Sequence, residues 1–300
     1  MKSLLSFFCL LFSLSAETLP HPEEQKAWEQ LRARFSSEVT VKKDNDGKIK
    51  ELSVKGLKDN PQRGSFSLKL GTDGHVTAIS ANQADIKNEE YKLIAAFSKL
   101  TNLALWHNGK YDLSGKNYSE HDGSGTIHLK NLSHLKNISL AGGSLDDEGL
   151  NALSQLPHLE ALGIWHIHAS NKGFARLANA PQLKSLRMGP NFLAKQNPEL
   201  LVELAKNKKI SYLKFGETWF SYQQLKNYLT DSNVTKLELG NAIIRQEDFD
   251  KIKAEFPAVN ISWEGNAPAG KLFKSKKWIL NIAAKWIPED VLKMSMDSAK

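Results

Sequence analysis

The sequence predicts an α/β solenoid with a parallel concave β-sheet, short convex helices and an N-terminal cap of helix and strands. One observation is a repeated triplet of the form apolar-x-x-apolar-x-apolar, whose copies lie 24, 35, 24, 24, 27, 24 and 24 residues apart. A second is the polar or Gly-rich turn and the further apolar run that follow a triplet, as in residues 141–156. A fixed period of this size is typical of stacked-repeat solenoids. The triplets begin at Val76, Leu100, Leu135, Leu159, Leu183, Ile210, Val234 and Ala258.

Residues 1–16 have the features of a cleaved secretory signal peptide. Lys2 supplies a positive start, residues 4–14 form an apolar run, and small residues precede a cleavage point after Ala16. The run is too short to span a bilayer. Because the only cysteine, Cys9, lies within this segment, we expect a secreted or periplasmic mature chain without disulfides, cysteine–metal sites or a thiol nucleophile.

Residues 17–70 are expected to form the N-terminal cap and a degenerate first repeat. Within them, residues 17–37 predict a helix, and Pro22 suits its first turn. Apolar residues recur at helical spacing, which gives the helix a face that would cover the open core of the first repeat. These residues are Trp28, Leu31 and Phe35.

A β-rich module is predicted over residues 38–80. Ile49, Leu52 and Val54 already fit the repeated triplet, which is why a degenerate repeat is expected here. The next apolar residues alternate with polar ones, as in a strand, before a Gly-containing turn at residues 71–74. The regular repeats are then expected to occupy residues 71–264.

The helical part of each repeat carries its own signals. Ser221 and Gln224 have the spacing of a capping box at the start of one convex helix. The segment Leu145-Asp-Asp-Glu-Gly-Leu150-x-x-Leu153 resembles the turn into the convex helix in ribonuclease-inhibitor-like leucine-rich repeats. Over residues 48–264 the chain resembles secreted bacterial leucine-rich-repeat proteins of this kind, which implies an interaction scaffold and no particular chemistry.

The asparagine that this family places at the ninth repeat position occurs at Asn108 and Asn191 and is replaced in the other repeats, so the internal asparagine ladder is expected to be weak. The period is also interrupted twice, by three extra residues around 195–198 and by an insertion over residues 109–126. Insertions in solenoids map to loops on one face, often the binding face. The insertion over residues 109–126 is therefore a candidate contact for a binding partner. Alternatively, it is an ordinary connecting loop.

Residues 265–300 are expected to form a linker and a basic amphipathic helical tail. Residues 271–277 are basic, and the following apolar run contains Trp278 and Trp286. This segment either folds back as a cap on the last repeat or makes peripheral contact with an anionic membrane through residues 271–287. The run is too short to cross a bilayer.

The net charge of +7 does not indicate a nucleic-acid-binding groove. Basic and acidic residues number 11 and 9 over residues 17–70, 21 and 21 over residues 71–270, and 7 and 3 over residues 271–300. The repeat body is therefore neutral, and most of the excess lies in the tail. We expect no nucleic-acid partner.

The concave face should carry the residues that lie between the apolar positions of each triplet, because strand side chains alternate between faces. Most of these residues are small or polar, but Trp106 and Trp165 occupy the same position in two repeats, on either side of Ala141. This predicts a shallow groove with Asn137, Ser139 and Ala141 as its floor and the tryptophans as its walls; alternatively, the tryptophans fold over the strand ends and pack locally. The candidate binding residues are Trp106, His107, Trp165, His166, Arg187, Tyr212 and Lys214.

The sequence contains no recognisable catalytic motif. There is no nucleophile elbow, phosphate-binding glycine loop or zinc-protease helix. His107, His166 and His168 could converge, but no carboxylate or cysteine accompanies them at ligand spacing. We therefore expect no enzymatic activity, no cofactor and no metal.

The expected function is non-catalytic binding of a protein or peptide outside the cytoplasm, by a monomer. Exposed tryptophan is the residue type most enriched at binding hot spots. One alternative is binding of a cell-envelope glycan through the paired tryptophans. The other is an envelope-associated scaffold that uses the basic C-terminal tail.

Overall fold

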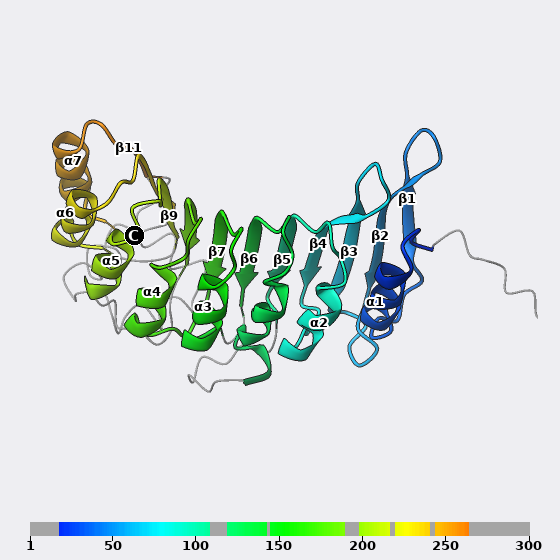
Figure 1. Cartoon of the computed structure of the whole chain (residues 1–300). Helices are drawn as coiled ribbons and strands as arrows, with labels where there is room; N and C mark the ends of the chain where they lie inside the picture. The colour runs from blue at the N-terminus through cyan, green and yellow to red at the C-terminus, as the bar shows by residue number, and fades with distance from the viewer. Residues whose placement is uncertain are drawn as a thin grey trace, which may run out of the picture.

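The computed structural model describes residues 18–108, 119–142, 145–189, 198–216, 220–240 and 244–263. In these residues the chain forms one 11-stranded sheet whose strands lie side by side in chain order, with the repeat helices along one face (Figure 1). The predicted α/β leucine-rich-repeat solenoid is confirmed. The predicted signal peptide, the C-terminal tail and residues 109–118 of the insertion lie outside the described residues.

The strands are short. They are β1 (Thr40–Lys43), β2 (Ile49–Lys55), β3 (Ser65–Leu70), β4 (Val76–Asn82), β5 (Asn102–Trp106), β6 (Asn137–Ala141), β7 (Ala161–Trp165), β8 (Ser185–Met188), β9 (Tyr212–Gly216), β10 (Lys236–Gly240) and β11 (Asn260–Ser262). The helices are α1 (Pro22–Arg32), α2 (Tyr91–Ile94), α3 (Asp147–Ser154), α4 (Asn171–Leu177), α5 (Pro198–Ala205), α6 (Tyr222–Asp231) and α7 (Gln246–Glu255). Three 3-10 helices are η1 (Asn88–Glu90), η2 (Ser119–His121) and η3 (Ser124–Leu129).

The N-terminal module is an antiparallel meander, which corrects the prediction of a degenerate repeat within residues 17–70. Strands β1 to β4 pair antiparallel with their neighbours, and parallel pairing begins only between β4 and β5. A true repeat would contribute a parallel strand. The triplet at Ile49, Leu52 and Val54 misled because a half-buried antiparallel strand also buries alternate residues, here Leu52 and Val54.

Helix α1 packs against the face of the meander that continues the apolar core. Trp28 is 1% exposed, and its ring centroid lies 6.0 Å from that of Phe66 on β3. The buried Glu24 carboxylate accepts the Val76 backbone N–H at 2.9 Å and lies 2.9 Å from Nδ1 of His75. The cap is therefore held by aromatic packing and by a buried carboxylate that bonds to the start of β4.

From β4 onward the repeats stack in register. Each strand pairs parallel with the next, so that Leu103, Ile138 and Leu162 occupy equivalent positions. These triplet residues are buried, and they form one continuous apolar core with the helices of the outer face. The residues between them face the opposite side of the sheet, as the alternation predicts.

The described part of the insertion, residues 119–126, belongs to the convex layer. Asp122 accepts a hydrogen bond from the Asn88 side-chain amide at 2.6 Å, and Thr126 is fully buried. A β-carbon at Gly149 in α3 would lie 2.1 Å from the Asp122 backbone oxygen, so α3 packs tightly against this segment. The described residues of the insertion thus pack in the convex layer, and a role of the insertion in binding stays a prediction.

Local signals read from the sequence are confirmed at several places. Ser221 and Gln224 form the predicted capping box at α6. Asn108, the predicted ladder asparagine, accepts the Ile86 backbone N–H at 2.7 Å and donates to the Ile86 carbonyl at 2.6 Å. In the described residues, none of the helices has both the length and the apolarity needed to cross a membrane.

Candidate binding site on the concave face

In strands β4 to β7, the residue that directly follows the strand has left-handed backbone geometry. Gln83, His107 and His166 have φ of 51°, 49° and 58°, and Gly142 occupies the same place with φ of 66°. Histidine is one of the non-glycine residues that tolerate this region. The two histidines that follow the tryptophans therefore turn the chain from the sheet toward the convex side.

Trp106 and Trp165 pair over Ala141, which closes the predicted groove at that position, whereas Asn137 and Ser139 of its expected floor line a hollow beside the pair. Their ring centroids are 6.4 Å apart with an interplanar angle of 36°. Ala141, one of the three expected floor residues, is 5% exposed. The two rings therefore close over the end of β6 as an aromatic pair, and Trp106 stays 39% exposed while Trp165 is half-buried.

Trp165 lies on a bed of glycines from its own strand and the next two. A β-carbon at Gly189 would lie 2.0 Å from Cδ1 of Trp165, and one at Gly163 would lie 3.1 Å from Cζ3. A β-carbon at Gly216 would lie 3.5 Å from Nε1. The indole can lie flat across the sheet only because these concave positions have no side chains.

A hollow of about 410 Å³ lies beside the aromatic pair on the same face. Small residues, Ala104, Ser139 and Gly163, form part of its lining, and Arg187 also lines it. Its polar lining includes two asparagines at the starts of the strands, where the Asn137 amide donates to Asn102 Oδ1 at 2.8 Å. The hollow thus combines an aromatic wall, a polar floor and one exposed cation.

Beyond Arg187 the concave face carries a network around Glu238 on β10. Tyr212 donates its hydroxyl proton to Glu238 at 2.8 Å, and Lys214 and Lys236 lie 3.2 Å and 2.6 Å from the carboxylate. Lys236 also lies over the Tyr212 ring, 5.1 Å from its centroid. This half of the face is positively charged, because it carries three cations, Arg187, Lys214 and Lys236, and one carboxylate, Glu238.

The Glu238 network should survive in acid. The hydrogen bond from Lys236, helped by those from Tyr212 and Lys214, lowers the pKa of Glu238 from 4.5 to about 2. Because the folded-state pKa is lowered, the stabilisation is fully present above pH 4.5 and is lost as the pH falls through about 2. An NMR pH titration of the Glu238 carboxyl carbon should show this, and the Lys236→Gln variant should move the pKa back toward its usual value. An unshifted Glu238 in the wild-type chain would contradict the network.

The candidate histidines do not line the hollow. His107 Nδ1 lies 3.0 Å from Oδ1 of Asn82. The pKa of His107 is lowered, mainly by desolvation and to a smaller extent by the nearby charge of His166. His168 is buried behind the strand ends. Among the described residues, no group of three or more His, Cys, Asp or Glu side chains is arranged to hold a metal ion.

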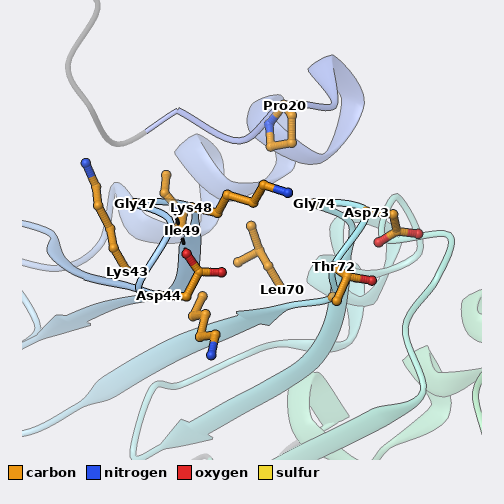
Figure 2. A pocket seen from close by; sticks show the side chains of 12 residues that line it. Pro20, Lys43, Asp44, Gly47, Lys48, Ile49, Leu70, Thr72, Asp73 and Gly74 are labelled. Atoms are coloured by element: carbon orange, nitrogen blue, oxygen red, sulfur yellow. Dashed lines mark hydrogen bonds between the residues drawn. The ribbon is translucent and has the colours of Figure 1, made fainter.

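A second hollow, of about 510 Å³, lies in the N-terminal module between two hairpin turns and the start of the cap (Figure 2). Lys43, Lys48 and Lys50 contribute to its lining together with Asp44 and Asp73. Each of the two carboxylates accepts a backbone hydrogen bond within its own turn. Asp44 accepts the Lys48 N–H at 2.9 Å, and Asp73 accepts the His75 N–H at 3.2 Å. This hollow is larger than the concave one, but it contains no aromatic side chain and its acids are committed to the fold.

The structure thus sorts the predicted site residues into three groups. Trp106, Trp165 and Arg187 meet at the hollow, while Tyr212 and Lys214 join the adjoining network. The histidines turn the chain at the strand ends. Glu238 and the glycines under Trp165 stand at concave positions of the same register but are not among the predicted binding residues.

Comparisons with known proteins add the following. No protein-family model matches the sequence, and neither does any curated protein. Similar solved structures include internalin C2 of Listeria monocytogenes, with 19% identity and a TM-score of 0.35 over 65% of this chain and 76% of that one. A leucine-rich-repeat protein of Leptospira interrogans has 21% identity and a TM-score of 0.35 over 57% of this chain and 38% of its own. Internalin F of Listeria monocytogenes has 16% identity and a TM-score of 0.30 over 57% and 58%.

Proposed function

We propose that this chain is a non-catalytic scaffold that binds a protein or peptide through its concave face and acts outside the cytoplasm. The observation that carries the proposal is the exposed indole of Trp106, backed by Trp165 and bordering a hollow of about 410 Å³. A tryptophan that is held in place loses little conformational freedom when a partner covers it. The site therefore has an aromatic anchor with a polar surround.

The geometry favours an extended ligand with an acidic or polar part. The strands hold the floor residues at fixed spacing, since neighbouring strands in a sheet lie about 4.8 Å apart. A ligand that covers Trp106 and runs along the face reaches Arg187 and then Lys214. Apolar contact at one end and cations at the other suit an amphipathic peptide better than a small apolar molecule.

Truncation of Trp106 is expected to weaken ligand binding at least about tenfold, as for an aromatic hot spot. Peptides would be selected from a displayed library on the full mature chain, and their affinities measured by fluorescence anisotropy for wild-type and Trp106→Ala protein. Val202→Ala is the matched control, because Val202 on convex helix α5 is the other large apolar side chain exposed in the described residues. Peptides that bind all three proteins equally would contradict a concave site.

Binding of a cell-envelope glycan is the second candidate, and one observation favours it. The aromatic pair adjoins the Asn102 and Asn137 amides and the Ser139 hydroxyl, and this mixture suits a sugar ring with its hydroxyls. Envelope oligosaccharides should then quench tryptophan fluorescence in the wild-type chain, and the Trp106→Phe and Trp165→Phe variants should respond less. No saturable quenching would rule this candidate out.

The location and the tail belong to the same proposal. The apolar run with small residues before Ala16 supports export, and N-terminal sequencing of protein from the cell envelope or medium would test it. A role of residues 271–287 in envelope association is the third candidate, supported by the basic and tryptophan-containing sequence of that segment. Catalysis forms no part of the proposal.

A further inference from the structure

The parallel register brings one class of loop to a single edge of the solenoid. Strands β5 to β11 start at equivalent positions, so the loops that lead from the helices into these strands all lie at the strands' amino ends. We call this set the strand-entry edge. It comprises residues 95–101, 130–136, 155–160, 178–184, 206–211, 232–235 and 256–259.

The strand-entry edge is strongly basic although the repeat body as a whole is neutral. Its loops contain seven lysines, all exposed, and one acidic residue, Glu160. Carboxylates gather instead where the helices begin, at the opposite edge; examples are Asp85, Asp122, Asp146, Asp147 and Glu148. The lysines are Lys99, Lys130, Lys136, Lys184, Lys206, Lys208 and Lys209.

Helix dipoles explain part of this separation but do not neutralise it. Cations are favoured where helices end and anions where they begin, and each terminus carries only about half a charge. Glu160 is shared by Lys136 at 2.9 Å and Lys184 at 3.1 Å, so one carboxylate serves two cations. Lys208 and Lys209 donate to the backbone carbonyls of Asp231 and Pro181, which carry no full charge. Lys206 is paired with Glu203 at 2.6 Å, and the remaining lysines leave a net positive charge along the edge.

We propose that the strand-entry edge is a docking surface for an anionic phospholipid bilayer. The lysines come from the loops that enter β5, β6, β8 and β9, and all of them are long, exposed side chains. None of these lysines lines either of the two hollows described above. A flat anionic surface fits such a set of lysines, and lysines near it gain electrostatic attraction.

This docking leaves the candidate binding site open. The concave side chains project from the face of the sheet, whereas the lysines lie along its edge. A chain standing on this edge presents Trp106 and Arg187 sideways to the bilayer, within reach of a partner at the membrane surface. The inference goes beyond the proposed function, because it concerns a different surface and a different class of partner.

The test is co-sedimentation of the full mature chain with vesicles of phosphatidylcholine and phosphatidylglycerol, compared with vesicles of phosphatidylcholine alone. An edge variant replaces Lys99, Lys136, Lys184, Lys208 and Lys209 with glutamine. The control variant replaces five exposed lysines of the N-terminal module, which gives the same net charge. These are Lys43, Lys48, Lys50, Lys58 and Lys69.

The wild-type and control proteins should bind the anionic vesicles, and the edge variant should bind at least about tenfold more weakly. Binding should also weaken as salt is raised, since the Debye length is only about 8 Å at physiological ionic strength. Equal losses in the edge and control variants would overturn the proposal, because net charge alone would then explain binding. The proposal would also be overturned if the wild-type protein did not bind the anionic vesicles, even if it bound a soluble polyanion such as dextran sulfate.

A third variant separates the edge from the tail. It replaces Lys271, Lys274, Lys276 and Lys277 with glutamine and keeps the edge intact. If vesicle binding is lost in this variant and kept in the edge variant, the proposal is wrong. Peptide affinity at the concave face, measured on the edge variant, should equal that of the wild type, so failure of one proposal is distinguishable from failure of the other.

Discussion

Replacing Trp28 with alanine should lower the free energy of unfolding by about 3–5 kcal/mol, the usual cost of truncating a large buried aromatic residue. Trp28 is 1% exposed and packs against Phe66, which is fully buried in the meander. The position is also the place where the stacked core would otherwise end. In a solenoid each unit contacts only its neighbours, so the loss of the cap exposes the apolar end of the whole array.

Urea unfolding followed by circular dichroism measures this effect, and Trp106→Ala serves as the control. The control removes the same side chain from a site where it is 39% exposed, so its cost should stay below about 1 kcal/mol. Hydrogen exchange should show where the loss falls, with the largest gain in exchange over β2, β3 and β4. If the two variants lose similar stability, helix α1 does not cap the core as described.

The repeat register could be predicted from the sequence because two independent constraints agree. Each triplet must bury its apolar residues on one side, and each strand must meet its neighbour in the same register. The equivalence of Leu103, Ile138 and Leu162 follows directly. Once the register is known, the concave positions follow as well, because strand side chains alternate.

Strand direction in the N-terminal module could not be predicted in this way. Burial of alternate residues in β2 is the same in an antiparallel pair and in a parallel one that faces solvent on one side. Strand direction is indicated instead by the short connections between the strands, such as the turn at residues 71–74. A parallel neighbour needs a longer crossover, so a turn of this length indicates a hairpin.

The arrangement of the two tryptophans also lay beyond the sequence pattern. Their shared repeat position predicts that both project from the concave face, but ring orientation depends on which neighbours lack side chains. Gly163 and Gly189 decide it, since they leave room for the Trp165 indole on its own strand and the next. The predicted floor residues Asn137 and Ser139 do line the hollow, but Gly189, which supports the Trp165 indole, does not.

Charge distribution gives a similar lesson. Counted along the chain, the repeat body is neutral, and this count excludes a uniformly basic groove. Counted by loop class, the lysines separate from the carboxylates, because helix starts and helix ends lie at opposite edges of the sheet. The separation is visible in the sequence only after each residue has been assigned to one type of loop.

Replacing Gly189 with alanine should lower the free energy of unfolding by about 1–3 kcal/mol, the usual cost of overpacking. The three atoms nearest to the new β-carbon would all belong to Trp165, at 2.0, 2.6 and 2.7 Å. Gly189 cannot easily retreat, because its N–H donates to the Ile164 carbonyl at 2.9 Å. The indole must therefore rotate off the sheet, and near-UV circular dichroism should report the loss of the tryptophan pair.

The effect of Gly189→Ala on the free energy of unfolding should change sign when Trp165 is also replaced with alanine. Without the indole the clash disappears, and a glycine outside the left-handed region gains about 0.4–1 kcal/mol on replacement with alanine, because the unfolded chain loses entropy. Gly189→Ala should then be neutral or stabilising in the Trp165→Ala background, with a coupling energy above about 1 kcal/mol in the double-mutant cycle. Gly163→Ala is the matched control: its contacts are longer, at 3.0 and 3.1 Å, so its cost should be smaller. Additive effects of Gly189→Ala and Trp165→Ala would show that the indole does not lie on the glycine bed, and the proposed anchor for a ligand would lose its support.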